Sequence, residues 1–129
     1  MDLQSASATP CTIRLRQAGN ITILDLAGEI DTFADEPLEA AYTCAAAVQP
    51  HSLLLNFAQV DYINSTGIAL IVAILAQARR NHIALLACCL SEHYQEIFRI
   101  TCLSDFIKVF ADEESALRQA AHPVIGPMP

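Results

Sequence analysis

The chain has 129 residues, 53% of them hydrophobic, and its 14 acidic and 7 basic residues give a formal net charge of −7. This length and composition suit one domain with a single core. The shortage of Lys and Arg argues against a nucleic-acid partner, because phosphate backbones bind clustered basic residues. Solubility alone, or a basic protein partner, explains the acidic balance.

The sequence contains no segment that suits a membrane span. The longest uncharged apolar stretches, residues 67–76 and 83–90, are shorter than the about 18–20 residues that a span requires. The first ten residues also lack the order of basic, apolar and small residues found in a signal peptide. We therefore expect a cytoplasmic protein.

The two ends of the chain differ from its middle. Residues 1–10 are rich in Ser, Ala and Thr, and residues 122–129 contain three prolines, so we expect both segments to be flexible. Residues 12–16 alternate between apolar and polar, Gly19-Asn20 supplies a tight turn, and residues 21–26 form the returning strand. This pattern predicts an N-terminal antiparallel β-hairpin.

A helix and a buried strand are expected next. Apolar residues recur at helical spacing over residues 33–48, with Asp31 or Thr32 as the cap. Pro37 is tolerated only near the first turn, which allows the helix to begin a residue or two later. Residues 52–57 are apolar on both faces, as a central strand covered by helices would be.

The second half of the chain alternates between helices and strands. A helix over residues 65–80 leads to an apolar strand at 83–89, and a helix over 91–101 follows. A short strand at 106–110 and an acid-rich helix at 112–121 complete the series. This order indicates an α/β fold with a mainly parallel or mixed sheet and helices packed on it.

Two hydroxyl residues mark the start of the helix over residues 65–80. Ser65 is well placed as the N-cap, Thr66 follows it, and Arg79-Arg80 close the last turn, where the helix dipole favours cations. The first-turn N–H groups have no partner within a helix, so a phosphate on either hydroxyl would be stabilised there.

The crevice between strand ends and helix starts is the usual site in such a fold. Gly67 has no side chain, which leaves room for the backbone of a partner to approach. The residues expected to border a partner-binding site at this crevice are Asp31, Asp61, Asn64, Ser65, Thr66 and Gly67.

Two segments resemble those of a known family. Asp61-Tyr62-Ile63-Asn64-Ser65-Thr66-Gly67-Ile68 resembles the Asp-Ser-Ser/Thr-Gly signature of the STAS domain, the fold of bacterial anti-sigma factor antagonists. Gly28-Glu29-Ile30-Asp31 resembles the turn that ends the second strand in that family. The resemblance covers about residues 11–121 and implies a mixed, mainly parallel sheet with an N-terminal hairpin and about four helices.

The resemblance also implies a function. In the family an anti-sigma factor that is a serine kinase phosphorylates the first hydroxyl residue of the signature, here Ser65. The unmodified protein binds that anti-sigma factor and releases a sigma factor, and a phosphoserine phosphatase is an optional further partner. Asn64 replaces the family's Asp. Phosphorylation is then slower, directed to Thr66, or absent, and in the last case the chain is a constitutive STAS scaffold. A transporter-associated STAS binding subunit is a separate alternative, because STAS-like proteins also bind transporter ATPases.

Little in the sequence indicates a catalytic site or a metal site. A serine enzyme would need a His base and an oxyanion hole, yet there is no Gly-x-Ser-x-Gly elbow and no His in the loops near Ser65. Cys88-Cys89 with His93 matches no zinc spacing, and the five cysteines suit reduced, mostly buried thiols. No Gly-rich phosphate loop occurs. We expect no enzyme activity, cofactor or metal.

Overall fold

One five-stranded sheet forms the centre of the protein, and its strands are arranged in space in the order of the chain. The computed structural model describes residues 9–121. The strands are β1 (Thr12–Ala18), β2 (Ile21–Ile30), β3 (Ser52–Ile63), β4 (Ala84–Cys88) and β5 (Lys108–Phe110). β1 and β2 are antiparallel, and every later neighbour pair is parallel. The expected hairpin and mixed, mainly parallel sheet are confirmed.

Four α-helices occur in the described part of the chain, together with two short 3-10 helices. They are η1 (Thr32–Ala34), α2 (Asp35–Ala47), α3 (Ser65–Arg80), α4 (Glu92–Ile100), η2 (Leu103–Asp105) and α5 (Glu113–Ala121). The side chain of Ser91 caps α4 as expected, since its hydroxyl accepts from the N–H of Tyr94. The four α-helices agree with the number that the family resemblance implies.

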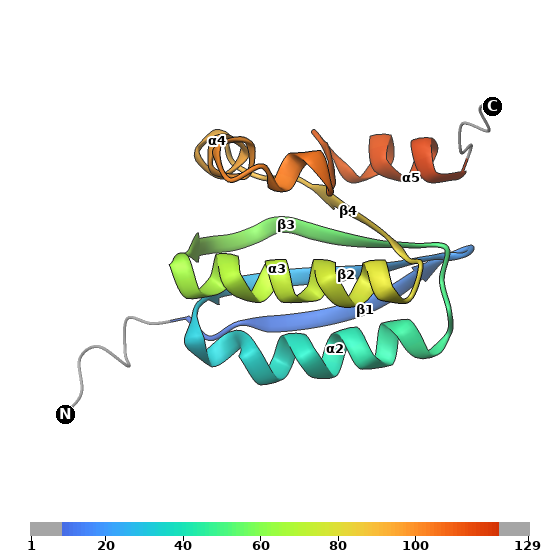
Figure 1. Cartoon of the computed structure of the whole chain (residues 1–129), viewed down its shortest axis with the longest axis horizontal. Coiled ribbons are helices and arrows are strands. Elements are labelled where there is room, and N and C mark those ends of the chain that lie inside the picture. The colour runs from blue at the N-terminus through green and yellow to red at the C-terminus, as the bar shows by residue number, and fades with distance from the viewer. Residues whose placement is uncertain (1–8, 122–129) are drawn as a thin grey trace.

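The helices cover both faces of the sheet. Alternate strand residues such as Leu24, Leu53 and Leu55 point into the larger core, which also holds buried residues of α2, α3 and α4. Ile23 and Leu54 point the other way, into a smaller core that is covered by α5. Figure 1 shows α2 and α3 side by side on one side of the sheet. None of the helices described is long and apolar enough to cross a bilayer.

The first expected helix divides into two elements. Residues 33–48 were predicted as one helix, but Asp31 caps η1 by accepting from the N–H of Phe33. α2 begins at Asp35, at the later start that Pro37 allowed. Pro37 consequently lies in the first turn of α2, where its missing N–H does no harm. Phe33 and Val48, the two end residues of the predicted helix, lie outside α2 and are exposed.

Two strands are longer than the sequence predicted. The predicted strand over residues 52–57 continues to Ile63, because its second half pairs with the second half of β2. Gly28 likewise lies inside β2 rather than in a turn that ends it. The backbone of Gly28 has φ +89, and a Cβ there would stand 2.3 Å from the carbonyl oxygen of Pro10.

The ends of the chain were expected to be flexible. Residues 1–8 and 122–129 lie outside the described part. Thr9, which the expected N-terminal segment included, accepts a hydrogen bond from the N–H of Glu29 over 3.0 Å. The expected short strand at 106–110 is shorter than predicted, because β5 begins at Lys108 after η2.

Candidate functional site

The helix that begins at Ser65 is capped by the residue before it. Asn64 has extended backbone angles, and its Oδ1 accepts from the N–H of Gly67 over 2.8 Å. Ser65 was expected to be the N-cap, but it is the first helical residue of α3. Asn and Ser are equally good caps, so residue type alone does not decide between them.

Ser65 is left free by this arrangement. Its side chain is exposed, as is that of Thr66, and within residues 9–121 no hydrogen bond involves the Ser65 hydroxyl. The N–H groups of the first helical turn have no acceptor one turn earlier, and the helix dipole is positive here. The site thus presents a free hydroxyl where added negative charge would be stabilised.

Gly67 serves a different purpose from the expected one. It is buried, and a Cβ at this position would stand 2.0 Å from the carbonyl oxygen of Ile30. The space that a partner backbone was expected to use is therefore filled by this chain's own β2. The close approach fixes the start of α3 against the end of β2.

The ends of two neighbouring strands bring the predicted residues together. Ile30 pairs with Ile63, and the N–H of Asn64 donates to the carbonyl of Ile30 over 3.2 Å. Asp31 and Asn64 therefore follow adjacent strand ends, as the crevice prediction required. Asp61 is exposed near the end of β3.

Two exposed aromatic residues next to these strand ends were missed from the sequence. Phe33 in η1 is 84% exposed, and Tyr62 in β3 is 50% exposed. η1 contacts α3, so Phe33 belongs to the same region as Ser65. Pro37 was the available signal, since it moves the helix start beyond Phe33. Exposed aromatic side chains of this kind are typical of protein-binding surfaces.

Tyr94 is a further residue that sequence reasoning did not connect with the site. Its phenolic oxygen accepts from the N–H of Ile63 over 2.9 Å, although the two residues are 31 positions apart. β4 ends at Cys88, opposite Asn56, so it offers no backbone partner to this part of β3. Tyr94 supplies the missing acceptor directly before the cap residue Asn64.

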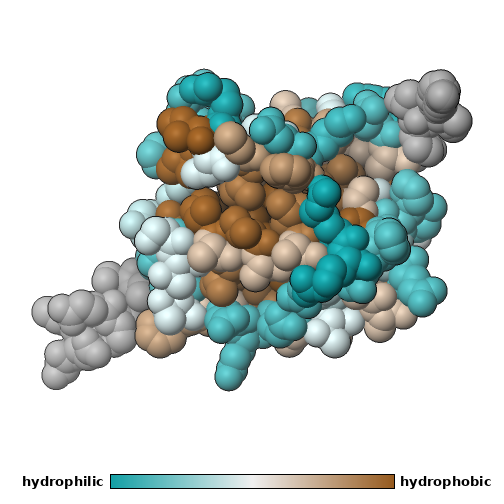
Figure 2. All heavy atoms as spheres, viewed as in Figure 1, coloured by the Kyte–Doolittle hydropathy of each residue, from teal (hydrophilic) through white to brown (hydrophobic). Residues whose placement is uncertain are grey.

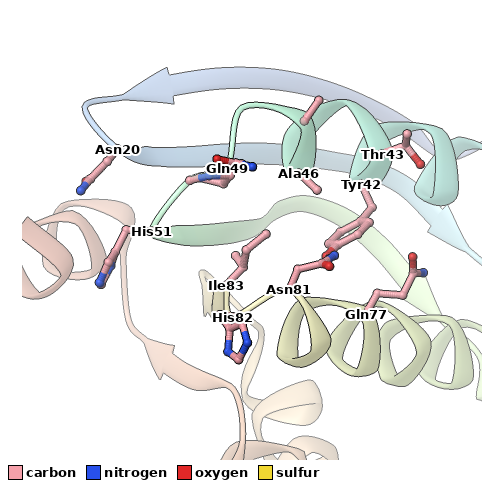
Figure 3. Close-up of a pocket in the computed structure, with 12 residues that line it drawn as sticks. Asn20, Tyr42, Thr43, Ala46, Gln49, His51, Gln77, Asn81, His82 and Ile83 are labelled. Carbon is pink, nitrogen blue, oxygen red and sulfur yellow. The ribbon is translucent and has the colours of Figure 1, made fainter.

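A separate cleft of about 860 Å³ lies at the other end of the strands, between the C-terminal ends of α2 and α3 and the start of β3 (Figure 3). Asn81 donates to the hydroxyl of Tyr42 over 2.7 Å there, and His51 and His82 lie at its rim. Ser65 does not line this cleft. The predicted site is consequently an exposed surface and not part of this cavity.

The cysteines differ in exposure more than the sequence suggested. Cys11 and Cys88 are buried, but Cys44 and Cys102 are exposed and Cys89 is half-buried, so the expectation of mostly buried thiols is wrong. Burial, and secondarily the Asp31 carboxylate, raises the pKa of the Cys11 thiol. Among the described residues, no three His, Cys, Asp or Glu side chains lie close enough to hold a metal ion.

Comparison with protein families matches most of the chain to one model, described as the STAS domain, over residues 12–116. The anti-sigma-B factor antagonist of Staphylococcus epidermidis is 32% identical to this chain over 82 residues. That alignment spans 64% of this chain and 76% of the relative.

Solved structures share the fold at lower identity. The crystal structure of an anti-sigma factor antagonist from Mycobacterium paratuberculosis has a TM-score of 0.73 and 18% identity, and the match covers 88% of this chain and 98% of the other. The phosphorylated form of the Bacillus cell fate determinant SpoIIAA has a TM-score of 0.67 and 19% identity, with 84% and 99% covered.

Proposed function

This chain belongs to the STAS domain family, and on that basis we propose that it is an anti-sigma factor antagonist switched by phosphorylation of Ser65. In its unmodified form it binds an anti-sigma factor that is also a serine kinase, and a sigma factor is released. The kinase then transfers a phosphoryl group to Ser65 and binding is lost. The relative from Staphylococcus epidermidis, an anti-sigma-B factor antagonist, supports this assignment.

The observation that carries the proposal is the free hydroxyl of Ser65. Because Asn64 accepts the capping hydrogen bond from Gly67, Ser65 has no capping role in the fold. A hydroxyl that is exposed on the first helical residue is accessible to a kinase. A phosphate on it would lie beside the free N–H groups of the first turn.

The switch is electrostatic. A phosphate adds about −1.5 to −2 charges. The helix N-terminus tolerates that charge, so the fold persists, but a docked partner would meet a bulky anion in the middle of its contact surface. Phe33, whose 3-10 helix contacts α3, supplies exposed apolar area near Ser65 for the unmodified complex, and Tyr62 is exposed near the end of β3. Asp31, Asp61 and Asn64 border the same region and complete the proposed docking site.

Asn64 in place of the family's Asp preserves the cap and removes one negative charge. Its Oδ1 makes the hydrogen bond that an Asp carboxylate would make at this position. The position of Ser65 is thereby kept, and only the charge read by the kinase changes. We therefore keep Ser65 as the acceptor, with Thr66 as the alternative.

The test is incubation with ATP and the cognate kinase-type anti-sigma factor, followed by intact-mass spectrometry and peptide mapping. We expect one phosphate, on Ser65, in the wild type and none in Ser65→Ala. Ser65→Asp should bind the anti-sigma factor at least about tenfold more weakly than Ser65→Ala, a difference of about 1.4 kcal/mol.

Thr66→Ala is the matched control, since it removes the neighbouring exposed hydroxyl and should still be phosphorylated. A phosphate that maps to Thr66 would move the switch by one residue. A stable complex with no phosphate on either residue would refute the switch and leave a constitutive binding module.

A further inference from the structure

An exposed apolar surface extends along α3 away from Ser65. We call it the α3 surface, and its residues are Ala69, Val72, Ala73 and Ala76 of α3, with Phe106 at the far end. Val72 is 44% exposed and Phe106 is 53% exposed. Figure 2 shows hydrophobic residues gathered in a hollow at the centre of this face, and hydrophilic residues over the C-terminal end of α3. Exposed apolar surface of this kind marks a site of interaction.

Two arginines stand at the C-terminal end of the α3 surface. Arg79 and Arg80 are exposed, and within the described part of the chain neither forms a salt bridge. The guanidinium of Arg79 lies over the ring of Phe106, 5.1 Å from its centroid. The helix dipole accounts for cations at this end, but it does not account for the exposed ring beside them. Arginine and aromatic side chains together are the residues enriched at binding hot spots.

The proposed Ser65 site needs such an extension. A stable interface takes about 800 Å² from each partner and about 20–30 residues a side, far more than the few residues around Ser65 provide. The α3 surface is continuous with Ser65 along one helix of 16 residues, about 24 Å in length. It also carries no charged residue between Ser65 and Arg79.

We propose that the α3 surface docks an amphipathic helix of the partner, apolar along its middle and acidic at the end that meets Arg79 and Arg80. This inference rests on the proposed function, because the same partner contacts Ser65 at the other end of α3. The apolar face recognises the helix through shape and burial, and the arginine pair fixes its direction. The partner is thus held at both ends of α3, and phosphorylation acts on one of them.

The first test is charge reversal at the arginine pair. We expect Arg79→Glu/Arg80→Glu to weaken binding of the cognate anti-sigma factor about tenfold, and to flatten the dependence of affinity on salt concentration. Arg118→Glu is the matched control, because Arg118 also lies exposed in the last turn of a helix, α5, which covers the other face of the sheet. The affinity of Arg118→Glu for the anti-sigma factor should equal that of the wild type. Reversal of acidic residues on the partner helix should restore binding to the double variant.

The second test places a charge in the middle of the apolar face. Ala73→Glu should weaken binding about tenfold or more, whereas Ala40→Glu should not, since Ala40 is an exposed helical alanine on α2, away from the α3 surface. Circular dichroism of all variants checks that α3 is intact, which is expected since Glu is a good helix former.

Failure of this inference is distinguishable from failure of the proposed function. A complex that forms with the wild type and with both α3 variants at equal affinity, while Ser65→Asp abolishes it, would overturn the α3 surface and leave the Ser65 switch standing. Binding that is insensitive to Ser65→Asp but lost in the α3 variants would support the surface without the switch. If no anti-sigma factor binds the wild type, both the proposed function and the role of the α3 surface are refuted.

Discussion

The phenolic oxygen of Tyr94 in α4 accepts a hydrogen bond from the backbone N–H of Ile63, the last residue of β3, over 2.9 Å. This bond replaces the strand partner that β3 lacks after β4 has ended. It joins α4 to the residue that directly precedes the cap of α3. The position of the Ser65 region therefore depends on a contact from a helix 31 residues further along the chain.

Tyr94→Phe should destabilise the protein by about 1 kcal/mol, because it leaves the Ile63 N–H without its acceptor. Urea denaturation measures the loss, and hydrogen exchange followed by NMR should show faster exchange of the Ile63 amide in particular. Tyr62→Phe is the control, since Tyr62 is 50% exposed and its hydroxyl makes no hydrogen bond with the described residues. Unchanged exchange at Ile63 in Tyr94→Phe would show that the bond contributes nothing.

At the start of α3, Asn64 has the structural role of the cap, and the neighbouring Ser65 has the proposed functional role. Asn64→Ala should cost about 1 kcal/mol of stability, since the Gly67 N–H loses its acceptor. Ser65→Ala should change stability by less than about 0.5 kcal/mol, because Ser65 is exposed and does not cap. Asn64→Asp keeps the cap and should stay near the wild type, while under the proposed function it should be phosphorylated faster. A larger loss in Ser65→Ala than in Asn64→Ala, measured by urea denaturation, would reverse the assignment of the cap.

Gly67→Ala should be among the most disruptive single substitutions near the site. Its Cβ would stand 2.0 Å from the Ile30 carbonyl oxygen, so α3 must move away from β2. We expect a loss of about 2–3 kcal/mol, measured by thermal or urea unfolding, although Ala favours helix. Thr66→Ala, at the adjacent exposed position, should cost less than about 0.5 kcal/mol. Equal stability of the two variants would mean that the contact with Ile30 does not constrain α3.

Local sequence patterns predicted the strand segments that are buried on both faces of the sheet. The apolar runs that became β4 and the first half of β3 were recognised because both faces of these strands are covered. The second half of β3 was not recognised, because only β2 pairs with it and several of its side chains face solvent. Gln59 and Asp61 interrupt the apolar run there, and the pairing with β2 continues the strand through them.

Contacts between distant segments account for the features of the site that were missed. The choice between Asn64 and Ser65 as the cap follows from where Gly67 meets Ile30, and the sequence offers two residues of equal capping strength. The bond from Ile63 to Tyr94 has no local signature at all. By contrast, Asp31, Asp61, Asn64, Ser65 and Thr66 were grouped correctly near the same strand ends, because parallel strands end together at one edge.

A polar network on the far face of the sheet should make stability depend on acid pH. Arg16 contacts Asp25 over 2.6 Å and Glu113 over 2.6 Å, and Asn56 also donates to Glu113. The hydrogen bonds from Arg16 lower the pKa of both carboxyl groups below their usual values. A folded pKa below the unfolded value of about 4 stabilises the protein above that pH, and the contribution is lost as the pH falls through the folded pKa.

Arg16→Gln should therefore lower stability at pH 7 and flatten the fall of stability between about pH 5 and pH 2, because both carboxyl groups then titrate nearer their unfolded values. Urea midpoints measured across this range test the expectation. Arg118→Gln is the control: its partner Glu114 is 85% exposed and 3.5 Å away, so solvent screens that pair. A wild-type pH profile in Arg16→Gln would show that the network, although it ties β1 and β2 to the start of α5, does not couple protonation to folding.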